Sequence, residues 1–74
     1  MDVDEAIELC GEIVRMIDED VPEHAWDKAA NFFESVRDKV VAMEETITDI
    51  GRVTEAQEEA LGNMQRGVAN WIRE

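Results

Sequence analysis

The chain has 74 residues, 45% of them hydrophobic, and a formal net charge of −12 at pH 7. This length suits a single small domain. The scarcity of Lys and Arg argues against direct binding to nucleic acid or to an anionic membrane surface. No segment approaches the ~18 uninterrupted apolar residues of a membrane span, and the acidic amino terminus does not resemble a secretory signal.

Cysteine is used once, at Cys10. A single cysteine excludes an internal disulfide and an all-cysteine zinc site, and it indicates a reducing compartment. A core of this size stabilises a fold by only about 3–5 kcal/mol. Closely packed helices or a partner subunit are therefore expected.

The first predicted helix spans residues 3–19. Asp2 is its expected N-cap, and Glu5 three residues later approximates a capping box. Apolar residues recur at steps of three and four along one half of this helix. The other half carries the carboxylates that form the predicted partner-binding site: Asp4, Glu5, Glu8, Glu12, Asp18 and Glu19.

The second predicted helix spans residues 22–50. Pro22 suits its first turn, with Asp20 or Val21 as the cap. Eight apolar positions keep a helical register, and no Gly or Pro interrupts them, which predicts one continuous helix of roughly 43 Å. Gly51 is the expected terminator. The eight positions are Trp26, Ala29, Phe33, Val36, Val40, Met43, Ile47 and Ile50.

The third predicted helix spans residues 55–73 and begins at a capping box of Thr54 and Gln57. Two glycines, Gly62 and Gly67, either permit close approach of another helix or are simply tolerated at about 1 kcal/mol each. The apolar stripe of this helix consists of Leu61, Met64, Val68 and Trp71, with Ala60 and Ile72 beside it.

The short turns make neighbouring helices antiparallel. We therefore expect one all-α domain over residues 1–74, a three-helix antiparallel bundle with a long central helix. The heptad spacing of the second helix also permits a homodimer.

Catalytic and metal-binding patterns are weak in this sequence. His24 is the only histidine and has no Glu-x-x-His spacing, so a carboxylate metal site is not expected. Cys10 lies on an apolar stripe without a basic sequence neighbour, which indicates an inert buried thiol. We expect no catalytic residue, no cofactor and no metal, and no enzyme activity. Phe32 and Val41 lie off the main stripe and are expected to pack at its edge, or to form a contact patch if exposed.

The acidic charge is concentrated at one end of the chain. Residues 1–23 hold nine acidic residues and one basic residue, a balance of −8, whereas residues 24–74 contribute −4. Three interpretations remain open: solubility, adaptation to high salt, or a docking face for a basic groove. Carboxylates four residues apart on a helix lie about 6 Å apart, so they present dense negative charge on a rigid rod, as a nucleic-acid backbone does.

Three segments suggest an origin: Phe33-Glu34-Ser35-Val36, Gly51-Arg52-Val53-Thr54-Glu55-Ala56-Gln57 and Ala60-Leu61. They resemble a helical hairpin with an F-x-S … G-x-[LV]-T-x-x-Q pattern, which occurs in small proteins of phages and mobile elements. The match covers Phe33 to Trp71, about half of the chain. In size, charge and phage-like character the chain also resembles anti-CRISPR proteins, which share no common sequence motif.

The resemblance implies a phage-type inhibitor in the cytoplasm of a bacterial or archaeal host. Its expected partner is a basic protein surface, such as that of a Cas protein or complex, with nucleic-acid access blocked by steric and electrostatic occlusion. The alternative is a non-inhibitory helical adaptor or assembly protein that dimerises through its heptad stripes.

Overall fold

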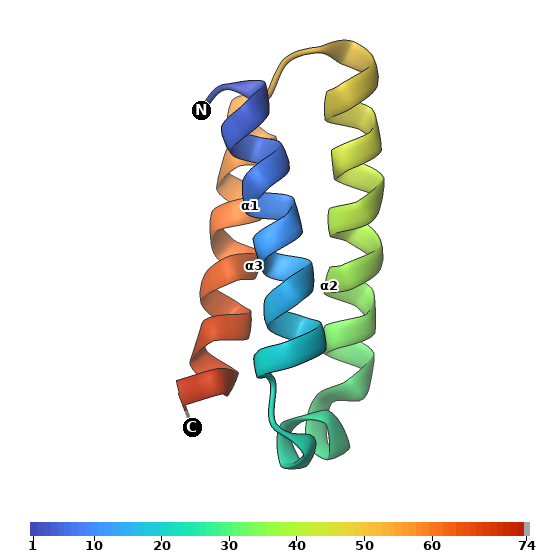
Figure 1. The fold of residues 1–74 in the computed structure, drawn as a ribbon, viewed down its shortest axis with the longest axis vertical. Helices are drawn as coiled ribbons and strands as arrows, with labels where there is room; N and C mark the ends of the chain where they lie inside the picture. Colours follow the sequence, from blue (N-terminus) through green and yellow to red (C-terminus); the bar gives the residue numbers. More distant parts are fainter. Residues whose placement is uncertain (74) are drawn as a thin grey trace.

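The computed structural model describes residues 1–73, which form three helices joined by short turns. Helix α1 spans Val3–Arg15 and continues into a π-helical turn, η1, at Met16–Asp20. Helix α2 spans Glu23–Ile50, and helix α3 spans Glu55–Arg73. Figure 1 shows α1 in front of α3, with α2 beside both and running in the opposite direction. The predicted all-α three-helix antiparallel bundle is confirmed.

Side-chain caps begin α1 and α3 at the residues that the sequence predicts. The N–H of Glu5 donates to Oδ1 of Asp2 at 2.8 Å. At α3 the capping box is reciprocal: the N–H of Gln57 donates to Oγ1 of Thr54 at 3.1 Å, and the N–H of Thr54 donates to Oε1 of Gln57 at 2.9 Å. These bonds satisfy amide groups that have no partner within the helix.

The two ends of α2 differ in how well the sequence predicts them. Gly51 ends the helix in the left-handed region, at φ 79° and ψ 22°, as predicted. At the other end, the prediction that Asp20 or Val21 caps the helix was wrong. Pro22 itself is the N-cap, with extended backbone at φ −71° and ψ 156°, and Glu23 is the first helical residue.

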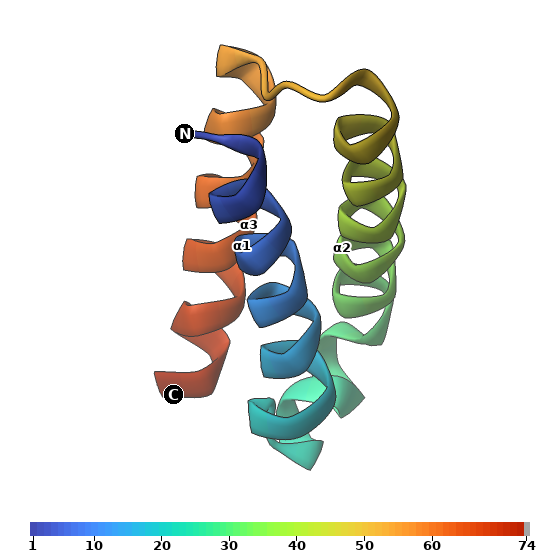
Figure 2. The ribbon, with the colours of Figure 1, turned by 45° about the horizontal axis from the view of Figure 1, so that its top comes forward.

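Helix α2 is kinked at Ala29, where φ is −140° and ψ is 35°. The prediction of one continuous helix was therefore wrong. Figure 2 shows the first turns of α2 crossing beneath the end of α1 before the helix bends upward. A straight helix of 28 residues would be about 42 Å long, longer than the 38 Å principal extent of the molecule.

The kink lets the first turns of α2 pack against the bundle. After the bend, residues 30–50 span roughly 31 Å, close to the roughly 28 Å of α3. Without it, the first two turns would extend past the neighbouring helices and leave their apolar side chains in water. Ala25 is instead fully buried, and Trp26 is half-buried.

The core contains residues from all three helices and from η1. Among the described residues, no polar or charged side chain is buried. None of the helices over this part of the chain has the length and apolar character to cross a bilayer. The buried core residues are Ala6, Cys10, Ile13, Ile17, Ala25, Phe33, Val36, Val40, Ile47, Leu61 and Val68.

Phe33 is the centre of an aromatic cluster near the kink. Its ring centroid lies 5.0 Å from that of Trp26, 5.4 Å from that of Phe32 and 6.0 Å from that of Trp71. The contacts to Phe32 and Trp71 are edge-to-face, the geometry that aromatic quadrupoles favour. The cluster joins the first and middle turns of α2 to the last turns of α3.

Candidate functional site

The acidic face of α1, which we define as Asp4, Glu5, Glu8 and Glu12, points away from the core. All four side chains are exposed, whereas Ala6, Cys10 and Ile13 on the opposite side of the helix are fully buried. The helix is held by its core side, so the four carboxylates are carried on a fixed backbone. Successive carboxylates four residues apart are about 6 Å from one another along this face.

The other two predicted site residues, Asp18 and Glu19, lie on η1, beyond the end of α1. The wider π-helical turn changes the angular spacing that the α-helical pattern assumed. Both side chains are exposed. Oδ1 of Asp18 lies 3.3 Å from Nη1 of Arg37 on α2, so this carboxylate is directed toward the neighbouring helix. Four of the six predicted residues thus lie on α1, and the other two lie on η1, where Asp18 pairs with Arg37.

The charge of the acidic face is not balanced by nearby cations. Within residues 1–73, the ion pairs are Asp18 with Arg37 and the Met1 ammonium with Glu58, at 3.2 Å. No Lys, Arg or ammonium nitrogen of these residues lies within 4.0 Å of a carboxylate oxygen of the acidic face. The face therefore presents its negative charge to solvent and to any cationic surface that approaches.

Neither residue with catalytic potential has the surroundings of a reactive group. His24 is exposed at the start of α2. Cys10 is fully buried, and burial raises the pKa of its thiol, with a smaller contribution from the negative charge of Glu44. A raised pKa suppresses the thiolate that would act as a nucleophile. In the described part of the chain, no group of three or more His, Cys, Asp and Glu side chains could hold a metal ion.

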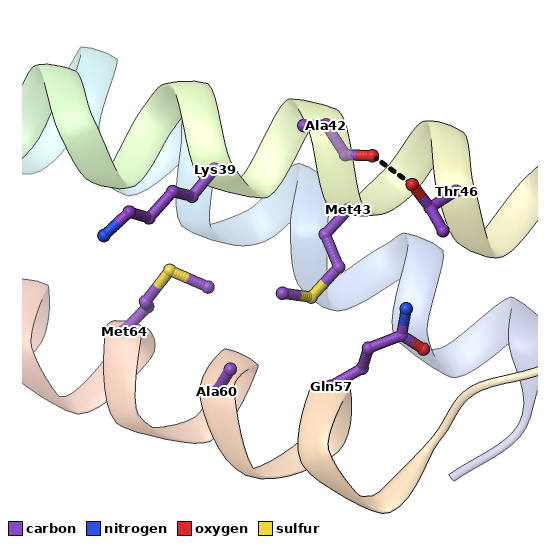
Figure 3. A pocket seen from close by; sticks show the side chains of 7 residues that line it. All are labelled: Lys39, Ala42, Met43, Thr46, Gln57, Ala60 and Met64. Atoms are coloured by element: carbon purple, nitrogen blue, oxygen red, sulfur yellow. Dashed lines mark hydrogen bonds between the residues drawn. The ribbon is translucent and has the colours of Figure 1, made fainter.

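An open groove of about 360 Å³ between α2 and α3 is a feature that the sequence did not reveal. Figure 3 shows Met43 of α2 and Met64 of α3 approaching each other across it, with Lys39 at one end and Gln57 near the other. Periodicity places both methionines on core stripes, yet both remain partly exposed. The short side chains of Ala42, Thr46 and Ala60 leave the groove open. Its lining consists of Lys39, Ala42, Met43, Thr46, Gln57, Ala60 and Met64.

The groove and the acidic face lie on opposite sides of the molecule. In Figure 1, α1 lies in front of α3. In Figure 3, which looks into the groove, the ribbon of α1 passes behind α2 and α3. A partner bound at one of these surfaces would therefore leave the other exposed.

The exposed hydrophobic side chains of α2 do not form a single patch. Phe32 is 38% exposed, Val41 is 43% exposed, and Ile50 is 61% exposed. At 100° per residue, Phe32 and Ile50 share one side of the helix, and Val41 lies on the opposite side. Ile50, predicted as the last core position of α2, is thus at the surface. Phe32 and Val41 cannot contribute to one contact patch.

Gly67 brings α3 close to Phe32, and Gly62 has no comparable role. A Cβ atom at position 67 would lie 3.2 Å from Cζ of Phe32, whereas one at position 62 would meet only the Arg66 side chain of its own helix, at 3.5 Å. The close-approach interpretation therefore holds for Gly67 and fails for Gly62.

Comparisons of the chain with protein-family models, with curated proteins and with solved structures found no match.

Proposed function

We propose that this chain is a phage-type inhibitor that binds a basic, nucleic-acid-handling protein through the acidic face of α1. Binding would place the helix across the groove that holds DNA or RNA and so block access of the nucleic acid. A component of a CRISPR effector is the specific candidate partner, on the strength of the resemblance to small phage proteins.

The observation that carries this proposal is the set of four exposed carboxylates on one face of α1, none with a cation of residues 1–73 within 4.0 Å. A surface kept only for solubility does not require its charges on a single helical face. The core contacts of Ala6, Cys10 and Ile13 hold this helix in place. A preorganised row of charge avoids the entropy cost of ordering a flexible acidic segment on binding.

The expected mechanism combines electrostatic steering with steric exclusion. A groove built to bind phosphates concentrates Lys and Arg, and it attracts a helix that carries dense negative charge. Complementary charge mainly raises the association rate. Binding should therefore weaken as salt screens the charges.

Charge reversal on the acidic face tests the proposal. The variant Glu5→Lys, Glu8→Lys, Glu12→Lys should keep its helix content, because Lys and Glu have similar helix propensities. The tagged full-length chain is incubated with host lysate, washed and eluted with steps of salt, and the eluted proteins are identified by mass spectrometry. The wild type should capture a basic nucleic-acid-binding protein that the variant fails to retain.

A second triple variant controls for net charge. Asp27→Lys, Glu34→Lys, Glu59→Lys makes the same change in charge at exposed positions of α2 and α3. It should capture the same protein as the wild type. Equal capture by both triple variants, or capture that survives high salt in all three chains, would contradict occlusion by the acidic face.

An inhibition assay tests whether the chain blocks the nucleic-acid groove of the captured protein or only binds elsewhere on it. The captured protein is purified, and its binding to labelled DNA or RNA is measured while the chain is added. Competition is expected: a higher nucleic-acid concentration should restore binding, and the acidic-face variant should not inhibit. For a CRISPR effector, target binding is measured with the assembled guide complex. A ternary complex of effector, nucleic acid and chain would contradict a blocked groove.

A further inference from the structure

The stripe that the sequence offers for dimerisation is mostly used within one chain. Val36, Val40 and Ile47 of α2 are buried in the core of the monomer. Self-association would therefore need a surface that is still exposed in the monomer. The side of α2 that borders the groove provides one, because two large apolar side chains remain exposed there.

This surface, which we call the α2 ridge, consists of Phe32, Lys39, Met43 and Ile50. All four residues follow the kink and lie within about 40° of one line along the helix, since 18 residues make five complete turns. The ridge is about 27 Å long. Its two ends are the exposed apolar side chains Phe32 and Ile50, and its middle borders the groove at Lys39 and Met43.

The spacing of the ridge is symmetric along the chain. Lys39 is seven positions after Phe32, Met43 is four positions after Lys39, and Ile50 is seven positions after Met43. The centre is therefore at Val41. An antiparallel copy related by a two-fold axis at this level would place Phe32 opposite Ile50 of the second copy, and Lys39 opposite its Met43.

We propose that two copies of this chain associate through the α2 ridge, antiparallel and centred at residue 41, so that each covers the exposed Phe32 and Ile50 of the other. The contact is isologous, which is the commonest arrangement in homodimers. Met43 and Met64 supply flexible side chains that adapt to the opposing surface.

Charge favours a second copy on this face over the acidic face of α1. Lys39 is the only charged residue of the ridge and of the groove lining, and it is basic in a chain of net charge −12. The −8 of residues 1–23 lies mainly on and around α1, on the opposite side. Two copies joined at the ridge therefore keep their acidic faces on the two outer sides of the dimer.

The available area is sufficient for a dimer. A standard interface removes about 800 Å² from each partner, roughly a sixth of the 4840 Å² accessible surface of this chain. The molecule measures 38 × 18 × 18 Å, so one long side offers an area of this order. The groove is too open to enclose a small molecule, which normally loses most of its surface on binding.

The dimer would carry two acidic faces, one on each copy, and its formation would alter neither. It does not depend on the proposed inhibitory function, because the ridge and the acidic face share no residue. Self-association should strengthen with salt, which screens the repulsion between two acidic chains. Binding of a basic protein to the acidic face should weaken with salt. The opposite salt dependences keep the failure of one proposal distinct from the failure of the other.

Analytical ultracentrifugation of the full-length chain, from low micromolar to near-millimolar concentration at low and high salt, measures the association. The matched variants are Ile50→Lys on the ridge and Val41→Lys on the opposite side of α2; both positions are exposed, so neither substitution should unfold the chain. We expect a concentration-dependent dimer that strengthens with salt, at least about tenfold weaker in Ile50→Lys and unchanged in Val41→Lys. A monomer under all conditions, or equal effects of the two variants, would overturn the proposal.

Cysteine cross-linking tests the register. The two copies of residue 42 would be offset along the helix axis by about 3 Å, and the two copies of residue 46 by about 15 Å. Under mild oxidation, Ala42→Cys should form an intermolecular disulfide and Thr46→Cys should not. The wild type is the control for Cys10, which is buried. Equal cross-linking at positions 42 and 46 would rule out a centre at residue 41.

Discussion

The two ends of the α2–α3 interface differ in how completely side chains fill the space between the helices. Near the kink, Phe32 lies against Gly67, and Phe33 contacts the ring of Trp71 at an edge-to-face angle of 71°. Toward the other end, Met43 and Met64 face each other across an open groove. Both ends carry the same three- and four-residue spacing of apolar residues. Periodicity sets which side of a helix faces its neighbour, and side-chain volume decides whether the space between the helices is filled.

This difference assigns the two ends to different roles. The closed end buries aromatic rings, which contribute most to the stability of a small core. The open end leaves apolar surface accessible, so it contributes less to stability and is available for contacts with another molecule. The following substitutions test that assignment.

The largest effect is expected for Phe33→Ala at the closed end. Phe33 is fully buried and contacts three other aromatic rings. Truncating a buried Phe costs roughly 3–5 kcal/mol, which is comparable with the whole stability of a domain of this size. The variant should be largely unfolded by circular dichroism at room temperature. A cooperative melt near the wild-type midpoint would show that the aromatic cluster does not support the fold.

A smaller and graded effect is expected on α3 from Leu61→Ala and Met64→Ala. Leu61 is fully buried, so its truncation should cost about 2–5 kcal/mol. Met64 is one turn further along the helix but lines the open groove, so its truncation should cost only about 1 kcal/mol, because part of its side chain is already in water. Urea unfolding of both variants gives the comparison. Equal losses would mean that the groove is closed in solution.

Glycine substitutions on α3 test its close approach to Phe32 of α2 and should have still smaller effects on stability. Gly62→Ala should stabilise the chain by up to about 1 kcal/mol, because Ala is the better helix former and the new Cβ meets only a flexible Arg66 side chain. Gly67→Ala should gain less or nothing, since its Cβ at 3.2 Å would displace Phe32. Differential scanning calorimetry measures the change in stability of each variant. An equal gain in both variants would show that Phe32 moves aside without cost.

Local signals predicted the helices well because they act within a few residues. The Thr54–Gln57 box, the left-handed Gly51 and the buried positions Phe33, Val36 and Val40 follow from capping chemistry and periodicity alone. These interactions need no knowledge of the other helices, so the sequence is sufficient to locate them.

The kink at Ala29 could not be predicted in the same way, because its cause is tertiary. Neither Gly nor Pro marks the position, and the apolar register continues across it. The bend follows from the mismatch between a long α2 and shorter neighbours, which is visible only once the helices are packed. Ala25, rather than Trp26, is consequently the fully buried residue of the first turns.

The exposure of the candidate residues was predictable, but the elements that carry them were not. The six carboxylates named from the sequence are exposed, and periodicity placed Asp4, Glu5, Glu8 and Glu12 on one outward face. It did not anticipate η1, the π-helical turn that carries Asp18 and Glu19. The groove also escaped prediction, because an apolar stripe does not reveal how closely two helices approach.

The smallest effect concerns Cys10 and its response to alkaline pH. Burial raises the pKa of the Cys10 thiol above its ordinary value of 9.0, and the carboxylate of Glu44 raises it further. The unfolded chain therefore loses this proton at lower pH than the folded chain does. The stabilisation is fully present below the unfolded pKa, and it is lost as pH rises through the folded pKa. Unfolding free energies from urea titrations between about pH 7 and about pH 10 should thus decline in the wild type more steeply than in Cys10→Ala.

The comparison with Cys10→Ala removes the other alkaline titrations, because Lys28 and Lys39 are present in both chains. The substitution also shortens a fully buried side chain, and that loss lowers stability equally at every pH, so only the slope carries the information. Parallel pH profiles would mean that the thiol is as free to ionise in the folded chain as in the unfolded one. The end of α1 that carries the acidic face would then be open to solvent on its core side, and the rigid backbone assumed for the four carboxylates would lose its basis.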